Sequence, residues 1–127
     1  MKLAAVFPGK YIQGEGVLAD LGSIIKNLGA KKPMLIWGKR TRNAAGETVF
    51  AALKEYGLDY YEHHFGGECS FAESAKIEAL VKENGCDIVV GLGGGKALDC
   101  SKAVANHTGL LNIIVPTAAS SDAPTSA

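Results

Sequence analysis

Short apolar runs alternate with segments of helical periodicity along most of this 127-residue chain. The helical segments place apolar side chains three or four residues apart, whereas the runs have the length of buried strands. Strand and helix repeat at intervals of about 25 residues, which is typical of β-α-β units. The sequence therefore predicts an α/β fold in which a parallel sheet is flanked by helices. The predicted strands are residues 33–37, 58–65, 87–92 and 111–115, and the predicted helices are 18–28, 49–56, 71–84 and a segment that follows Lys96 and ends near His107.

The composition is that of one globular domain, with 47% hydrophobic and 20% charged residues. Thirteen basic residues balance thirteen acidic ones, which argues against a general nucleic-acid binder. The longest early apolar run, residues 3–7, is too short for a signal peptide or a membrane span. We therefore expect a cytoplasmic domain with no nucleic-acid or membrane partner. Three cysteines without CxxC spacing argue against a disulfide framework and against a thiolate zinc site; they are Cys69, Cys86 and Cys100.

The end of the chain is a polar segment of the kind that begins a helix. Ser121 and Asp122 are suitable N-cap residues, and Pro124 suits a first helical turn. The sequence nevertheless ends at Ala127. We therefore expect this chain to be a truncated piece of a longer protein.

The strongest chemical signal is the segment GLGGGKALD, residues 91–99. Its consecutive glycines permit a tight turn between a strand and a helix, and they let an anion approach the backbone. Helix N-terminal amides and the Lys96 side chain would then suit a pyrophosphate. The pattern is not GxGxxG, and it is not a phosphate-binding Walker loop, because Ala97 stands where Ser or Thr would bind magnesium. The alternative is a glycine turn that only packs the strand against the helix.

Three segments together resemble one enzyme family. They are FPGKYIQGEGVLADLG (7–22), GGGKALDCSKA (93–103) and PTAASSDAPTSA (116–127). These segments resemble the glycerol dehydrogenase branch of the metal-dependent, iron-containing type of alcohol dehydrogenases. The resemblance implies a Rossmann-like, dinucleotide-binding N-terminal domain over residues 1–127, with NAD or NADP as the cofactor. It also implies a helical C-terminal domain after Ala127, in which one aspartate and two histidines bind zinc or iron.

The resemblance also implies roles for individual residues. Gly94, Gly95 and Lys96 match the pyrophosphate turn, and Asp99 matches an acidic position near the nicotinamide. On the bare sequence, Asp99 could equally form a surface ion pair with Lys96 or Lys102. The positions in the last segment that match cofactor-contacting residues are Thr117, Ser120 and Ser126. From sequence alone, the first two would be no more than part of a polar turn.

Asp122 matches an aspartate that contacts the polyol substrate in the family. Its alternative role is that of a helix N-cap. None of the three histidines matches a family ligand position. His63 and His64 are adjacent, so in a strand they point to opposite faces, and His107 lies near a predicted helix end. We expect no catalytic residue and no metal site within this chain.

The segment that follows the predicted strand at 33–37 bears on the choice of cofactor. Members that use NAD usually place an acidic residue there to bind the adenine ribose, and this chain has Gly38 instead. Lys39, Arg40 and Arg42 follow, and they could bind a 2′-phosphate by charge-assisted hydrogen bonds. We therefore expect NADP to be accepted and NAD to remain usable. The alternative is that the three cations only solvate an exposed loop.

The implied reaction is hydride transfer from glycerol or a similar vicinal diol to NAD(P), while a divalent metal polarises the substrate oxygen. We expect a homo-oligomer when the protein is complete, and no dehydrogenase activity from the 127 residues alone. We also expect the isolated chain to self-associate, with residues 116–127 least ordered. Three alternatives remain: another alcohol or sugar-phosphate dehydrogenase or a dehydroquinate synthase-like enzyme, a non-catalytic nucleotide-binding module, and a purely structural remnant.

Overall fold

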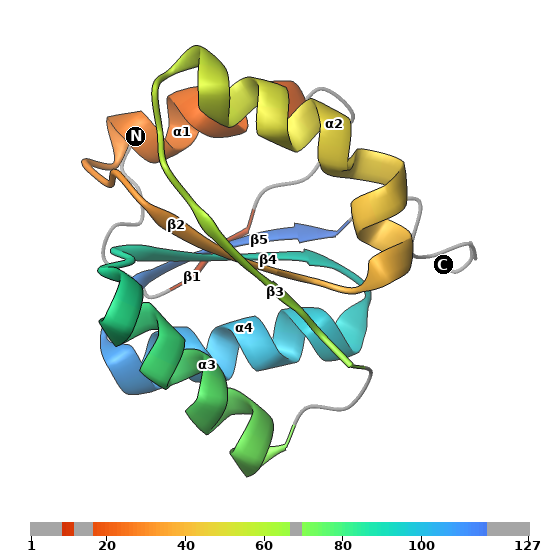
Figure 1. The fold of residues 1–127 in the computed structure, drawn as a ribbon, viewed down its shortest axis with the longest axis vertical. Coiled ribbons are helices and arrows are strands. Elements are labelled where there is room, and N and C mark those ends of the chain that lie inside the picture. The colour runs from red at the N-terminus through yellow and green to blue at the C-terminus, as the bar shows by residue number, and fades with distance from the viewer. Residues whose placement is uncertain (1–8, 12–16, 67–69, 117–127) are drawn as a thin grey trace.

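The computed structural model describes residues 9–11, 17–66 and 70–116, which form a single parallel sheet between two layers of helices. Figure 1 shows α1 and α2 on one face of the sheet, and α3 and α4 on the other. The sheet has five strands in the order β1-β5-β4-β2-β3. The strands are β1 (Gly9–Tyr11), β2 (Pro33–Trp37), β3 (Tyr61–His64), β4 (Ile88–Gly93) and β5 (Leu111–Pro116). The helices are a 3-10 turn, η2 (Val17–Asp20), and α1 (Leu21–Asn27), α2 (Lys39–Glu55), α3 (Phe71–Asn84) and α4 (Gly95–Thr108).

The predicted fold class is confirmed, and the main differences are the start of one helix, the length of one strand and one strand that was not predicted. Helix α2 begins at Lys39, ten residues before the predicted helix at 49–56. The periodicity missed this first part because its buried positions are the small residues Thr41, Ala45 and Gly46 rather than large apolar ones. Strand β3 has four residues instead of eight. Strand β1 was not predicted, since three residues carry no periodicity.

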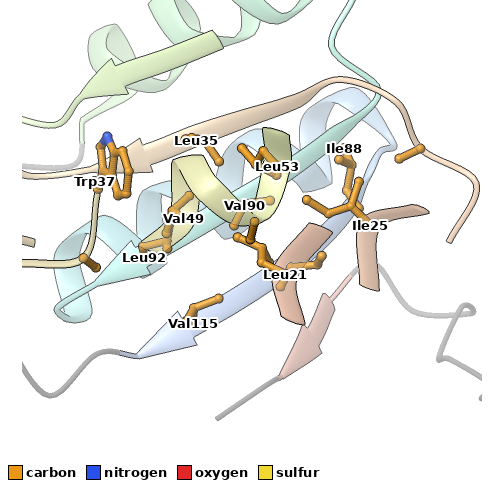
Figure 2. Packing of buried hydrophobic residues seen from close by; sticks show 14 residues of the cluster. Leu21, Ile25, Leu35, Trp37, Val49, Leu53, Ile88, Val90, Leu92 and Val115 are labelled. Atoms are coloured by element: carbon orange, nitrogen blue, oxygen red, sulfur yellow. The ribbon is translucent and has the colours of Figure 1, made fainter. Parts of the chain in front are cut away.

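The sheet is buried on both faces by two separate apolar clusters. In β2, Leu35 and Trp37 face α1 and α2, whereas Met34 and Ile36 face α3 and α4. Every residue of β2 and β4 is buried, as expected for central strands of a parallel sheet. Figure 2 shows the first cluster, in which side chains of α1 and α2 pack onto β2, β4 and β5. No helix in the described part of the chain has both the length and the apolar character needed to cross a membrane.

The chain changes direction across the sheet between β2 and β4. Strand β3 lies outside β2 on one side, and the chain then crosses back to place β4 on the other side of β2. The helix that follows β2 covers one face of the sheet, and the helix that follows β4 covers the other. The carboxyl ends of β2 and β4 therefore flank a topological switch point, the place where open α/β sheets bind ligands.

A close approach of α4 to β4 depends on glycine at position 91. A Cβ atom there would overlap the Cβ and Oγ atoms of Ser101. Ser101 is fully buried, and its Oγ atom accepts a 2.6 Å hydrogen bond from Asn112 Nδ2. The serine therefore cannot move aside without breaking a buried hydrogen bond.

We predict that Gly91→Ala lowers the free energy of unfolding by about 1–3 kcal/mol, the usual cost of overpacking. Urea denaturation followed by circular dichroism measures the change. The control is Gly46→Ala on α2, where the nearest atom to a new Cβ is Phe50 Cε2 at 3.5 Å. That control should raise the stability by about 0.5–1 kcal/mol, because alanine favours a helix interior over glycine. Equal stability of Gly91→Ala and the unsubstituted protein would contradict the packing argument.

Candidate functional site

An open cavity of about 550 Å³ lies at the switch point. Residues from three connections line it, each at the carboxyl end of a strand. They are Gly38, Arg40 and Thr41 after β2, Phe65 and Gly66 after β3, and Gly94, Gly95, Lys96 and Ala97 after β4. The structure thus brings together Gly38, Gly94, Gly95 and Lys96, which the sequence singled out. Thr41, Phe65 and Gly66 carry no motif and were not predicted.

Two helix N-termini open onto this cavity, and both have a glycine N-cap. Gly38 caps α2 and Gly94 caps α4, and neither helix has a side-chain hydrogen bond at its cap or an acidic residue in its first turn. Helix α3 differs, because Ser70 accepts a hydrogen bond from the Glu73 backbone N–H and Glu73 supplies a first-turn carboxylate. The first-turn N–H groups of α2 and α4 are therefore not satisfied by a capping side chain, and they suit an anionic group of a ligand.

The turn between β4 and α4 requires glycine for two reasons. Gly93 has a φ of +121°, which side chains rarely adopt. A Cβ atom on Gly93 would also lie 2.7 Å from Thr41 Oγ1, in the first turn of α2. This close approach draws the two helix N-termini together around one space. The cations that line this space are Arg40 and Lys96, which favour a ligand with more than one negative charge.

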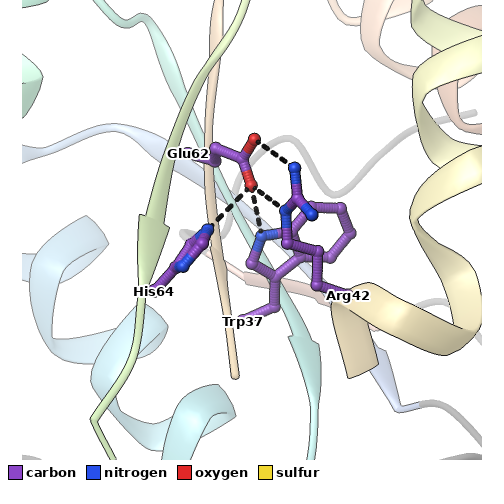
Figure 3. A network of polar contacts seen from close by, with 4 residues as sticks. All are labelled: Trp37, Arg42, Glu62 and His64. Carbon is purple, nitrogen blue, oxygen red and sulfur yellow. Dashed lines mark hydrogen bonds and ion pairs between the residues drawn. The ribbon is translucent and has the colours of Figure 1, made fainter. Parts of the chain in front are cut away.

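A second polar cluster surrounds the Glu62 carboxylate of β3 (Figure 3). Arg42 donates two hydrogen bonds to it, from Nε to Oε1 at 2.6 Å and from Nη2 to Oε2 at 3.2 Å. Trp37 Nε1 donates to Oε1 at 3.1 Å, and His64 Nε2 lies 3.2 Å from the same oxygen. We call Trp37, Arg42, Glu62 and His64 the Glu62 cluster. Its members come from β2, α2 and β3, so no local motif could have indicated it.

Similarity to known proteins extends along most of the chain. Residues 8–127 match the family model described as iron-containing alcohol dehydrogenase. The chain belongs to the iron-containing alcohol dehydrogenase family. It is 40% identical to the glycerol dehydrogenase of Citrobacter freundii over 94% of this chain, and 40% identical to the glycolaldehyde reductase of Halobacterium salinarum over 94% of this chain.

A solved relative supports the same assignment. The crystal structure of glycerol dehydrogenase from Schizosaccharomyces pombe superposes with a TM-score of 0.76 at 25% identity, and the match covers 86% of this chain and 28% of that one. The alignments cover 33% and 32% of the two curated relatives named above, so the chain spans about a third of their length. The resemblance inferred from the sequence motifs is confirmed at the level of the family.

The remaining predicted site residues are placed less completely. Asp99 lies exposed on α4 and is not among the residues that line the cavity. Its assignment next to the nicotinamide stays a prediction. The other predicted positions lie outside the described residues; they are Thr117, Ser120, Asp122 and Ser126. Residues 116–127, which were expected to be the least ordered, also lie outside the described residues except for Pro116.

The cationic segment after β2 is also not the exposed loop that was the alternative expectation. Lys39, Arg40 and Arg42 belong to the first turns of α2. Arg40 lines the cavity, whereas the guanidinium of Arg42 is paired with Glu62 and lies 5.3 Å from the centroid of the Phe50 ring. The prediction that Arg42 joins Arg40 in binding a ligand phosphate therefore does not match this conformation.

The histidines in the described part of the chain each pair with one carboxylate. His63 Nε2 lies 2.7 Å from Glu73 Oε2, and His107 Nδ1 lies 2.7 Å from Glu78 Oε2. Within residues 9–11, 17–66 and 70–116, no group of three or more His, Cys, Asp or Glu side chains could hold a metal ion. Burial also raises the pKa of the Cys86 thiol to about 11, which disfavours a thiolate ligand. The described residues therefore do not fit the metal that the family name implies.

Opposing effects act on the pKa of Glu62. Partial burial raises it, while the hydrogen bonds from Arg42, Trp37 and His64 lower it, and the net pKa lies below the ordinary value of 4.5. The hydrogen bond from Arg42 to Glu62 correspondingly raises the pKa of the guanidinium. A carboxyl whose pKa is lowered by folding stabilises the protein above its ordinary pKa, and that contribution is lost as the pH falls through the folded-state value.

We therefore predict that Glu62→Gln reduces the free energy of unfolding at pH 7, by an amount on the order of 1 kcal/mol or less because the pair is partly solvated. The difference from the unsubstituted protein should shrink as the pH falls below 4.5, the ordinary pKa of Glu62. Urea titrations at a series of pH values measure it. Glu47→Gln, at an exposed position of α2, is the matched control and should show a smaller effect at pH 7. A difference that persists undiminished in acid would contradict the electrostatic origin.

Proposed function

We propose that this chain is the dinucleotide-binding part of an NAD(P)-dependent dehydrogenase that acts on glycerol or a similar vicinal diol. The observation that carries the proposal is the cavity between two glycine-capped helix N-termini, lined by the cations Arg40 and Lys96. The family assignment and the 40% identity to a glycerol dehydrogenase support it.

The pyrophosphate would bind at the N-terminus of α4, on the backbone of Gly94 and Gly95 and beside Lys96. A Cβ atom on Gly95 would meet nothing within 4 Å, so this glycine borders open space that a ligand could fill. The adenosine ribose would lie toward Gly38 and Arg40, at the end of β2. A bound nicotinamide cofactor would supply the hydride acceptor.

Both nicotinamide cofactors are compatible with this part of the cavity. Gly38 presents no carboxylate to repel a 2′-phosphate, and Arg40 supplies a cation to bind one. We therefore propose that NADP is accepted and that NAD remains usable. The roles of Asp99, Thr117, Ser120 and Ser126 toward the cofactor, and of Asp122 toward the polyol, remain proposals that rest on the resemblance. We also propose a zinc or iron ion and a homo-oligomeric state from the resemblance, and a cytoplasmic location from the composition.

The similarity to glycolaldehyde reductase favours a second candidate, reduction of a small hydroxyaldehyde. It uses the same cavity and differs only in the substrate. Assays of the complete protein with glycerol and NAD(P), and with glycolaldehyde and NAD(P)H, separate the two functions by their relative kcat/KM.

For the cofactor, we predict that Lys96→Met weakens NADH binding about tenfold, which is the value of one charge-assisted hydrogen bond. Titration of NADH fluorescence measures the dissociation constant. Lys102→Met is the matched control, because Lys102 is exposed on the same helix but does not line the cavity. If both substitutions weaken binding equally, general charge rather than a specific contact accounts for the effect.

For the reaction, we predict that the 127-residue chain alone does not oxidise glycerol, since its described residues offer no metal site. The complete protein should oxidise glycerol, and a chelator should abolish that activity until a divalent metal is restored. A spectrophotometric assay of NAD(P)H formation tests both statements. Chelator-sensitive glycerol oxidation by the purified 127-residue chain would contradict the first.

A further inference from the structure

Two arginines at the start of α2 have opposite environments. Arg40 lines the cavity, whereas Arg42 points to β3, where Glu62 binds it through both carboxylate oxygens. The two positions are separated by about 200° around the helix axis, so Arg42 can reach the cavity only through the length of its side chain and its tilt toward the helix N-terminus. Figure 3 shows the guanidinium of Arg42 turned toward Glu62.

The position of Arg42 is fixed by several contacts. The fork of its guanidinium matches the carboxylate of Glu62, and the Phe50 ring lies 5.3 Å from Cζ. Glu62 is held in turn by Trp37 Nε1 and lies next to His64 Nε2. Trp37 is fully buried, so the indole provides a rigid donor. Glu62, itself held by Trp37, therefore sets the direction in which Arg42 points.

Arg42 nevertheless lies close to the cavity in terms of the backbone. Its N–H donates a 3.0 Å hydrogen bond to the carbonyl oxygen of Gly38, which lines the cavity. Side chains on a helix tilt toward its N-terminus, which here means toward Gly38. A cation in the first turns of a helix is also disfavoured by the helix dipole, so Arg42 needs an anion nearby. Glu62 is that anion, and a ligand phosphate near Gly38 would be another.

We propose that Glu62 is a specificity-determining positioning residue, which withholds Arg42 from the adenosine end of the cavity so that Arg40 is the arginine that meets a 2′-phosphate. This inference rests on the proposed function. It means that the discrimination between NADP and NAD depends on a residue of β3 that does not itself line the cavity. Removal of the Glu62 carboxylate releases Arg42 and strengthens the binding of NADPH in particular.

The test compares the dissociation constants of NADPH and NADH, measured by fluorescence titration of the complete protein. Glu62→Ala should shift the ratio toward NADPH by about tenfold, the value of one added charge-assisted hydrogen bond. Arg42→Ala should leave the ratio within about twofold of the unsubstituted value, because Arg42 is withheld already. The double variant Glu62→Ala/Arg42→Ala should lose the shift, which assigns it to Arg42.

Other outcomes overturn the inference. An equal loss of affinity for both dinucleotides in Glu62→Ala would mean that the Glu62 cluster only anchors α2 to β3. A selective loss of NADPH binding in Arg42→Ala would mean that Arg42 already contacts the phosphate. If Glu62→Ala does not fold, Glu62→Gln replaces it, since glutamine keeps an acceptor for Trp37 Nε1 and loses the charge; an unchanged ratio there also contradicts the inference. Failure of the unsubstituted protein to bind either dinucleotide would instead contradict the proposed function.

Discussion

The pairing of β2 with β4 is the interaction on which the rest of the structure depends. Both strands are buried along their whole length, so their backbone groups can be satisfied only by neighbouring strands. The register pairs Ile36 with Gly91, and the absence of a side chain at Gly91 lets Ser101 of α4 approach the sheet closely. Because the apolar side chains of β2 alternate between the two faces, both layers of helices pack against the same pair of strands.

The position of the cavity follows from this pairing. Helix α2 leaves the end of β2 toward one face, and α4 leaves the end of β4 toward the other, so the two helices diverge from neighbouring N-termini. Glycine N-caps leave first-turn amides for a ligand, and the approach of Gly93 to Thr41 holds the two turns together. Helix α3 starts at the same edge, but its N-terminus already has Ser70 as a capping side chain and Glu73 as a first-turn carboxylate. The contrast explains why anion binding is expected at two of these three helices.

The two arginines at the start of α2 make different contacts. The segment that follows β2 supplies Arg40 to the cavity and Arg42 to an ion pair that joins α2 to β3. The sequence shows only that both arginines follow Gly38. Glu62, the partner of Arg42, lies 20 residues further along the chain. A pattern read along the chain could therefore not show that Arg42 has a carboxylate partner on β3.

The sequence by itself determined the alternation of strand and helix, the parallel sheet and the glycine turn at residues 93–95, because periodicity and glycine content act locally. The family motifs, which are also local, indicated Gly94, Gly95 and Lys96; all three line the cavity, and their contact with a pyrophosphate stays a prediction. Only the tertiary structure decided that Gly38, Thr41 and Phe65 join that turn around one cavity, and that α2 begins at Lys39. The physical reason is that the order of strands brings β2, β3 and β4 side by side, and contacts between their ends depend on that order and not on any spacing along the chain.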